Sequence, residues 1–391
     1  MMFLDQSDEQ KKLRQELRTY FAELITPEVK AECHGNESGE TYKRVIRQMG
    51  EDGWLAIGWP KEYGGQGRSA AEQLVFFEEA QLAGAPIPFV TLNTVGPALI
   101  DHGSEEHKQF FLPKIAKGEI HFAIGYTEPG AGTDLASLGT TAVKEGDDYI
   151  INGTKVYTSS AEGADYIWLA ARTDKDAPKH KGITLFIVDC KDPGFSVAPI
   201  YTVGDVRTNM TYYENVRVPS SMIIGELNGG WKLITSQLNH ERVGLAAIGI
   251  NGTGHFQKVL NWAREVRGNG KRVIDEPWVQ NNLAEAYSLL EAMKVMNSRM
   301  AWELGQNKLC PGFASGIKVY STEALIQVYR LLLDVIGAPG MVRSGSEGAV
   351  IQGEIEEGYR KCQINTFGGG VNEVQRELAA MFGLRMARAA R

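Results

Sequence analysis

The sequence predicts an α+β protein in which a small antiparallel β domain lies between two helical domains. Apolar residues recur with a helical period up to about residue 122, strand-like segments follow to about 225, and the helical period then returns. Helices and strands that occur in separate blocks are typical of α+β folds, whereas alternating blocks would indicate a parallel sheet. We therefore expect an N-terminal helical domain at 1–122, a β domain at 123–225 and a C-terminal helical domain at 226–391.

The first helical domain is predicted by the spacing of its apolar residues. Leu13, Leu17 and Phe21 recur at four-residue steps with charged residues between them, which indicates one face of a helix. A glycine- and tryptophan-rich interruption spans 52–67, and a second helical stretch follows it. Pro113 predicts a break or a new helix start in that stretch, because proline lacks an amide donor.

The middle and last domains are predicted by a change of period. Short runs rich in Ile, Val, Tyr and Thr, such as DYIINGTKVYTSS and GITLFIVDC, are separated by Gly, Asp, Asn and Pro. Because no long helical pattern lies between them, we expect an antiparallel sandwich or barrel. Long amphipathic stretches after residue 226, such as STEALIQVYRLLLDVIG, predict a helical bundle.

Charge and cysteine content limit the classes of partner. The chain of 391 residues has a formal net charge of -7, so it lacks the basic surplus of nucleic-acid binders and of proteins that bind anionic membranes. No apolar stretch approaches the length of about 20 residues that spans a bilayer. The N-terminus lacks the apolar core of a secretion signal. The four cysteines form no close pair and no metal-binding spacing, so we expect a reduced, cytoplasmic protein without a metal site.

A carboxylate on an apolar helix face is the first candidate for catalysis. The residues that are spaced to share this face are Trp231, Ile234, Leu238, Glu241 and Leu245. Burial of a carboxylate raises its pKa toward the range of a general base. The alternative interpretation is that Glu241 forms a structural ion pair, for instance with the adjacent Arg242.

Two glycine-rich segments are candidates for ligand binding. GYTEPGAGTDLAS (125–137) allows close backbone approach and offers the hydroxyls of Thr127 and Thr133, but it is not the GxGxxG fingerprint of a Rossmann site. INTFGGGVNEVQREL (364–378) places three glycines before a helical pattern, where free N–H groups favour a phosphate or an oxyanion. A plain turn and a flexible interhelical loop are the alternative interpretations of these segments.

Five segments in chain order carry similarity to a known family. They are GWPKEYGGQG, GSEEHKQFFLPKIAKGE, YTEPGAGTD, NVRVP and GELNGGW, and together they resemble the acyl-CoA dehydrogenase family along nearly the whole chain. The resemblance implies a helical N-terminal domain, an antiparallel β domain and a C-terminal four-helix bundle, with FAD held between the last two. It also implies α,β-dehydrogenation of a CoA thioester to a trans-2-enoyl-CoA, with reoxidation by an electron-transferring flavoprotein.

The resemblance assigns individual residues to the site. Those implied to contact FAD are Tyr126, Thr127, Gly132, Thr133, Tyr157, Thr158, Ser159, Gly337, Val371 and Asn372. Thr133 and Arg242 are implied to contact the acyl-CoA substrate. Tyr157 stands where many family members have Trp, so we expect its ring to keep the stacking role.

The family carries its catalytic base at one of two positions. Most members have a glutamate in the loop before the last helices, where this chain has Gly369. A minority has it on the first helix of the C-terminal domain just before an arginine, where this chain has Glu241. The resemblance therefore implies that Glu241 removes the α-proton, while the N–H of Gly369 and a flavin ribityl hydroxyl bind the thioester oxygen.

The chain departs from the family where homotetrameric members bind the FAD pyrophosphate of a neighbouring subunit. The RxxFG-type segment is replaced by AREVRGNGKRVIDEP (263–277), and the following glycine motif is altered to DVIGAPGM (334–341). Arg267 or Lys271 could compensate in a homotetramer. Alternatively, an unlike acyl-CoA dehydrogenase-type chain completes an α2β2 assembly, as in the actinobacterial members of steroid side-chain degradation, which this chain resembles.

Other functions stay open from the sequence. They are a homotetrameric dehydrogenase of branched or medium-chain acyl-CoA, an acyl-CoA oxidase, a flavin monooxygenase, and a subunit that only completes the flavin site of a partner. Glu241 favours dehydrogenation over the flavin monooxygenase and over the flavin-completing subunit, because removal of a C–H proton needs a base. Oxidase activity depends on oxygen access to reduced flavin, and the acyl group is not determined.

Overall fold

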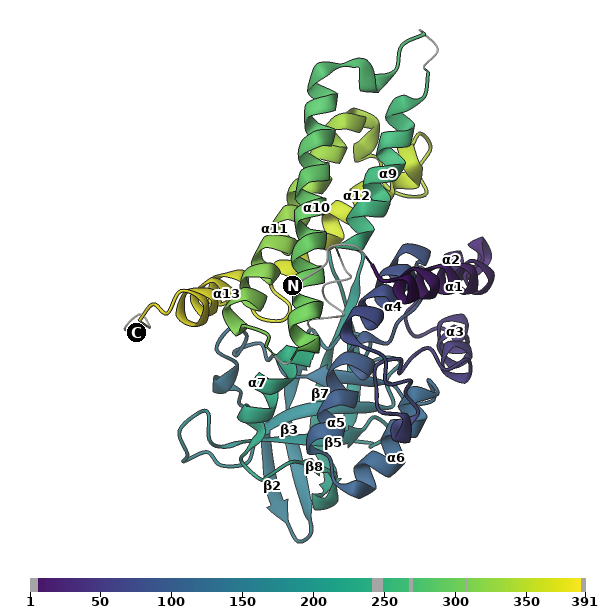
Figure 1. The fold of residues 1–391 in the computed structure, drawn as a ribbon. Coiled ribbons are helices and arrows are strands. Elements are labelled where there is room, and N and C mark those ends of the chain that lie inside the picture. Colours follow the sequence, from purple (N-terminus) through teal and green to yellow (C-terminus); the bar gives the residue numbers. More distant parts are fainter. Residues whose placement is uncertain (1–5, 241–248, 267–269, 307, 388–391) are drawn as a thin grey trace.

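The computed structural model describes residues 6–240, 249–266, 270–306 and 308–387. Helices of the N-terminal region cover one side of a sheet, and long C-terminal helices extend away from it (Figure 1). This arrangement confirms the predicted α+β class, with helices before and after a single block of strands. Among the described residues, no helix is both long and apolar enough to cross a membrane.

The N-terminal helices form where the apolar spacing predicts them. They are α1 (Asp8–Leu24), α2 (Pro27–Cys33), α3 (Glu40–Glu51), α4 (Ala70–Ala83), α5 (Gly96–His102) and α6 (Glu105–Ala116). Ser7 begins α1 with a capping box to Gln10, which satisfies two amides that the helix leaves free. The predicted break at Pro113 is wrong: α6 continues past it, and the carbonyl of Pro113 still accepts a hydrogen bond from Lys117 N (3.2 Å).

The strands form one eight-stranded sheet in the order β6-β7-β3-β2-β4-β5-β8, with β1 beside β4. They are β1 (Phe122–Gly125), β2 (Thr141–Glu145), β3 (Asp148–Val156), β4 (Tyr166–Arg172), β5 (Ile183–Asp189), β6 (Phe195–Tyr201), β7 (Arg207–Pro219) and β8 (Ile223–Ile224). Most neighbours pair antiparallel as predicted, but β1 and β2 each pair parallel with β4. These parallel pairings depend on contacts between distant segments, so a local pattern does not reveal them.

The C-terminal region is a bundle built around two long helices. Its helices are α7 (Gly230–His240), α9 (Ile250–Arg264), α10 (Pro277–Gly305), α11 (Pro311–Ile336), α12 (Glu354–Cys362) and α13 (Asn372–Leu378). The buried face of α11 is apolar over most of its length, and it packs against α9, α10, α12 and α13. Because α11 contacts so many elements, its side chains can position the loops that join them.

A clasp of charged residues links the sheet to the bundle. Asp205, in the hairpin between β6 and β7, accepts hydrogen bonds from Arg343 (2.5 Å) and Arg360 (2.6 Å) of the C-terminal region. Both arginines lower the pKa of Asp205, so this carboxylate is charged at neutral pH. Arg360 also donates to the carbonyl of Val203 in the same hairpin (2.6 Å). The clasp therefore fixes one edge of the sheet against α12.

Candidate active site

The end of β3 lies directly beside the first glycine-rich segment. The amide of Val156 donates to the carbonyl of Thr127 (2.8 Å). This hydrogen bond joins the predicted flavin contacts Tyr126–Thr133 to those at Tyr157–Ser159, although some 25 residues separate the two groups in the sequence. The structure therefore brings these two groups of predicted residues together in one place.

A buried ion pair holds the two segments in this position. Lys155, which is fully buried on β3, donates to Glu128 Oε1 (2.8 Å) and to the carbonyl of Tyr126 (3.0 Å). Glu128 in turn accepts hydrogen bonds from the amides of Gly139 (2.6 Å) and Thr140 (2.8 Å). One carboxylate and one ammonium thus tie together both ends of the loop that carries the predicted ligand contacts.

Burial and pairing act in opposite directions on these two charges. Burial lowers the pKa of Lys155 to about 8, although the adjacent Glu128 favours its charged form. Burial would raise the pKa of Glu128, but Lys155 and the amide donors hold that pKa below its usual value. Both groups are therefore charged at neutral pH, and each depends on the other to remain so.

The turn after β3 exposes an aromatic ring. Tyr157 has a positive φ of 61°, and 63% of its surface is exposed. Such a backbone is strained for a bulky residue, and strain of this kind is often found at ligand sites. The turn is held by Asn209, whose backbone and side-chain amide bond to the N–H and the carbonyl of Thr158 (both 3.0 Å). Tyr157 is consequently presented on a rigid support.

The neighbours of Tyr157 differ in how they face solvent. Ser159 is exposed, as are Gly132 and Thr133 across the loop. Thr158 is fully buried, and its hydroxyl lies 3.3 Å from that of Thr211. The side chain of Thr158 therefore faces the protein interior, and only its backbone remains available for the predicted contact.

Tyr126 connects the loop to the helix that leads to Glu241. Its hydroxyl accepts a hydrogen bond from Trp168 Nε1 (3.0 Å) and donates to Gln237 Oε1 on α7. Gln237 is 2% exposed, and in the described part of the chain its Nε2 has no hydrogen-bond partner. Gln237 lies four residues before Glu241 in the sequence, and its buried amide is the part of α7 that meets the loop through Tyr126.

The second glycine-rich segment forms a separate loop on the bundle. It runs from the short 3-10 helix η8 (Gln363–Thr366) to α13, and Figure 1 shows α13 at the level where the bundle meets the sheet. Gly369 and Gly370 both have positive φ, of 68° and 90°, which a residue with a side chain rarely adopts. Within the described ranges, the amides of Gly369, Gly370 and Val371 donate no hydrogen bond.

Two other predicted residues lie elsewhere or face inward, and the structure does not describe two more. The side chain of Asn372 is buried and bonds to Thr322, Glu323 and Lys318. Gly337 ends α11, and lies 19 residues from Lys318, or roughly 28 Å along that helix. Within one chain Gly337 is therefore distant from the loop at Gly369. Glu241 and Arg242 lie outside the described residues.

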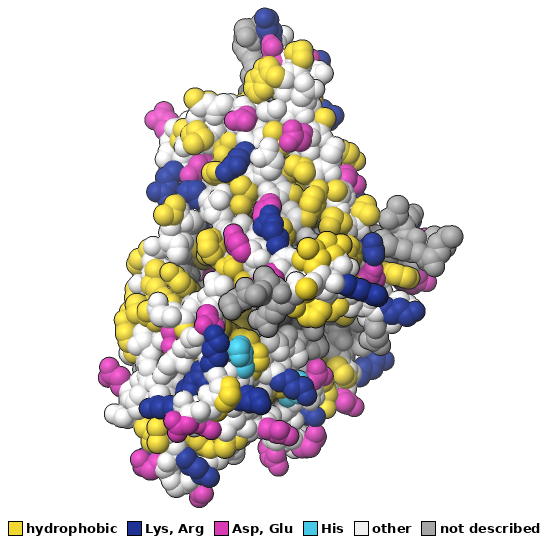
Figure 2. All heavy atoms as spheres, turned by 90° about the vertical axis from the view of Figure 1, so that its left-hand side faces the viewer, with side chains coloured by type: hydrophobic (Ala, Val, Ile, Leu, Met, Phe, Trp, Pro, Cys, Tyr) yellow, Lys and Arg dark blue, Asp and Glu magenta, His cyan; other side chains and the backbone are white. Residues whose placement is uncertain are grey.

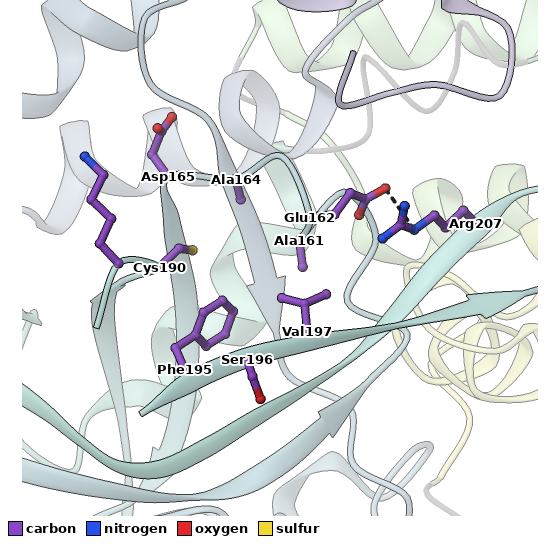
Figure 3. Close-up of a pocket in the computed structure, with 10 residues that line it drawn as sticks. Ala161, Glu162, Ala164, Asp165, Cys190, Phe195, Ser196, Val197 and Arg207 are labelled. Carbon is purple, nitrogen blue, oxygen red and sulfur yellow. Dashed lines mark ion pairs between the residues drawn. The ribbon is translucent and has the colours of Figure 1, made fainter. Parts of the chain in front are cut away.

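A surface pocket of about 440 Å³ lies on the β domain (Figure 3). Its lining comes from the segment after that turn, the end of β5 and strands β6 and β7, and includes none of the predicted site residues. Glu162 and Arg207 form an ion pair at one edge of it (3.4 Å), and Glu162 also accepts a hydrogen bond from Asn209 Nδ2 (2.6 Å). Burial raises the pKa of the Cys190 thiol, which therefore stays protonated.

Comparison with known proteins identifies the family. Family models for the acyl-CoA dehydrogenase N-terminal, middle and C-terminal domains match residues 7–119, 123–216 and 228–384. The chain is 48% identical to acyl-CoA dehydrogenase FadE26 of Mycobacterium tuberculosis, with 100% of both chains covered. The chain belongs to the acyl-CoA dehydrogenase family. It is accordingly an oxidoreductase of the class that acts on CH–CH groups, and members of this family are flavoproteins.

Two solved structures are similar over almost the whole chain. One, described as the Tcur3481-Tcur3483 steroid ACAD, is 51% identical with a TM-score of 0.94 and covers 99% of this chain and 100% of its own. The other, the ChsE4-ChsE5 complex from Mycobacterium tuberculosis, is 49% identical with a TM-score of 0.94 and the same coverage. The fold predicted from the resemblance is thereby confirmed.

The described residues of this acyl-CoA dehydrogenase fit a flavin. The exposed ring of Tyr157 can stack on a planar ligand. A Cβ placed on Gly132 or Gly368 would meet no atom within 4 Å, so both glycine-rich loops border open space. The free amides at 369–371 can donate to carbonyl oxygens of a ligand.

Sequence reasoning missed the residues that support the site from within. Lys155 and Glu128 both belong to segments that the resemblance singled out, but a lysine is rarely predicted to be buried. Gln237 could have been found, because it continues the helix face of Ile234 and Glu241. Lys318 gave no signal, since it lies in a long amphipathic helix where a charged residue is common.

We predict that Lys155→Met destabilises the protein by about 3–5 kcal/mol, because it leaves the Glu128 carboxylate buried without its counter-charge. Urea unfolding of the variant measures this loss. Lys179→Met is the matched control: its ion pair with Asp134 (2.7 Å) is about half exposed, so its loss should cost at most about 1 kcal/mol. Equal effects of the two substitutions would show that the buried pair does not hold the loop.

Proposed function

We propose that this chain is the catalytic subunit of an FAD-dependent acyl-CoA dehydrogenase that acts on a steroid side-chain CoA thioester. The observation that carries this proposal is the full-length similarity to a structure described as a steroid ACAD. Two unrelated features of the chain support it: the sequence has a glutamate at one of the two base positions of the family, and the loop at the other position has free amides.

Glu241 acts as the general base of the reaction. The α-proton of a thioester is too weakly acidic for an unassisted carboxylate, so the developing enolate must be stabilised. The N–H of Gly369 donates to the thioester oxygen, and its lack of a partner among the described residues supports this role. Bound FAD supplies the acceptor for the hydride that leaves Cβ. The base, the amide and the acceptor together account for a trans-2-enoyl-CoA product.

The chain holds FAD between the β domain and the glycine-rich loop of the bundle. Tyr157 stacks on the ring system, and the exposed Gly132, Thr133 and Ser159 approach it with backbone and hydroxyl groups. Thr158 contributes through its backbone, because its side chain is buried. The other residues proposed to contact FAD are Tyr126, Thr127, Val371, Asn372 and Gly337, of which Gly337 lies far from the loop at Gly369. Thr133 and Arg242 contact the substrate.

An unlike chain of the same family completes an α2β2 assembly with this one. Exposed large apolar side chains gather on the C-terminal segment, where Phe367, Phe382, Leu384 and Met386 are all more than half exposed. Figure 2 looks onto the side of the molecule from which this segment projects, and shows hydrophobic patches between its charged side chains. Such patches are typical of interaction surfaces. A similar structure is itself described as a complex of two chains, ChsE4 and ChsE5. An electron-transferring flavoprotein reoxidises the enzyme.

We predict that Glu241→Gln abolishes reduction of the bound flavin by substrate while the flavin stays bound. Loss of a general base lowers such a rate by about 10²–10⁴-fold. Anaerobic stopped-flow bleaching with a panel of CoA thioesters, including steroid-derived ones, measures the rate and identifies the acyl class. Glu226→Gln, an exposed carboxylate before α7, is the control and should bleach at the wild-type rate. Wild-type bleaching in Glu241→Gln would assign the base to another residue or chain.

We predict that the chain binds stoichiometric FAD only when it is co-expressed with an unlike family member encoded nearby. Light scattering and flavin content measure mass and occupancy of the complex. The double variant Phe382→Ser, Leu384→Ser should weaken association, whereas Val143→Ser, an exposed apolar residue on β2, should not. A homotetramer with one FAD per subunit and full activity, purified from this chain alone, would contradict the heteromer.

A further inference from the structure

The loop that carries Gly369 is held from its inner side by a single ammonium group. Lys318, on α11, donates to the carbonyl of Thr366 (3.0 Å), to the carbonyl of Gly370 (2.8 Å) and to Asn372 Oδ1 (2.7 Å). A lysine ammonium has three donors, and all three are used here. The contacts span the loop from its beginning at η8 to its end at α13.

A second donor completes the inner side of the loop. Gln375 Nε2 on α13 donates to the carbonyl of Gly369 (2.9 Å), next to the carbonyl of Gly370 that Lys318 holds. The described chain contains no cis peptide, and a trans peptide directs its N–H opposite to its C=O. The amides of Gly370 and Val371 must therefore point away from the side chains of Gln375 and Lys318. Within the part of the chain that the structure describes, they have no hydrogen-bond partner, and neither does the amide of Gly369.

The ammonium group of Lys318 forms its hydrogen bonds with these carbonyl groups. Burial lowers the pKa of Lys318 to about 8, while Glu373 and Glu323 favour the charged form from a distance. Glu323 makes its own ion pair with Arg376 (2.7 Å). Lys318 itself forms no ion pair in the described part of the chain. Removal of an ammonium group from water costs free energy, which the hydrogen bonds to peptide carbonyls offset. Such a group therefore indicates that the loop backbone it binds is held in one conformation.

We propose that Lys318 is a positioning residue of the dehydrogenation, which fixes the loop Thr366–Asn372 so that its free amides face the thioester oxygen and the flavin. The inference rests on the proposed function, because that function makes the amide of Gly369 an oxyanion donor. Lys318 touches neither substrate nor cofactor and acts through the backbone that it holds. Misplacement of a reacting or stabilising group by about 1 Å lowers a rate by about 10²-fold.

The test compares Lys318→Met with wild type in the flavin-loaded complex with the partner chain. Lys318→Met removes every donor while it keeps the length of the side chain. We expect it to retain flavin and thioester binding, with KM changed less than threefold, and to be bleached about 10²-fold more slowly at saturating thioester. Lys308→Met, an exposed lysine after α10, is the matched control and should bleach at the wild-type rate.

A spectroscopic measurement separates positioning from a loss of stability. Cinnamoyl-CoA, an enoyl thioester with a near-ultraviolet chromophore, shifts its absorption to longer wavelength when its carbonyl is polarised by hydrogen bonds. We expect this shift in wild type and a clearly smaller one in Lys318→Met at full occupancy. If Lys318→Met does not fold, Lys318→Gln decides, because its amide keeps two donors and should give an intermediate rate and an intermediate shift.

The outcomes distinguish this inference from the proposed function. If no thioester bleaches the wild type, the proposed function fails. If the wild type is bleached and the folded lysine variants bleach within twofold of it with an unchanged cinnamoyl-CoA shift, Lys318 has no positioning role. A slower rate that matches the loss of flavin in proportion would likewise overturn the inference, because the lysine would then only maintain occupancy.

Discussion

The buried pair of Lys155 and Glu128 is the interaction on which the predicted flavin site depends. Other side chains also hold the loop 126–140, since Arg172 on β4 donates to the carbonyls of Ala136 and Leu138, but of the contacts of this loop in the described structure only this pair places two opposite charges in the interior. The pair joins β3 to both ends of this loop, and so sets the position of Tyr126 and of the turn at Tyr157. Desolvation makes the pair costly, and that cost is offset only while both partners are present. The arrangement is therefore rigid, and neither residue can be removed alone without destabilising the site.

The same physical device occurs a second time in the bundle. Lys155 is fully buried and Lys318 is partly buried; burial lowers the pKa of each to about 8, and both donate to backbone carbonyls of a glycine-rich loop. Glycines allow the backbone of each loop to approach a ligand, but they also make it flexible. An ammonium group on the inner side of each loop restores a defined conformation and leaves the outward groups free. Hydrogen bonds from a lysine ammonium group thus restrain a loop that its glycines would otherwise leave flexible.

Much of the fold was predictable because it depends on local patterns. The period of Leu13, Leu17 and Phe21 predicts a helix that buries those side chains, and the structure buries all three. The order of sheet strands was not predictable, because the parallel pairing of β1 with β4 joins segments more than 40 residues apart. The inward orientation of Thr158 and Asn372 was also hidden, since a motif gives the residue type but not the direction of its side chain. The domain boundaries and the roles of the site residues remain predictions.

The proposed reaction depends most on one step, the removal of the thioester α-proton by a base that this chain itself supplies. The most direct measurement uses an acyl-CoA whose β-carbon bears no hydrogen, so that proton removal can be observed without oxidation. Incubation of the flavin-loaded complex in D2O, followed by mass spectrometry, measures deuterium entry at Cα. We expect rapid exchange with wild type, and exchange slower by about 10²-fold or more with Glu241→Gln. Equal exchange in both, at equal flavin content, would contradict this role of Glu241.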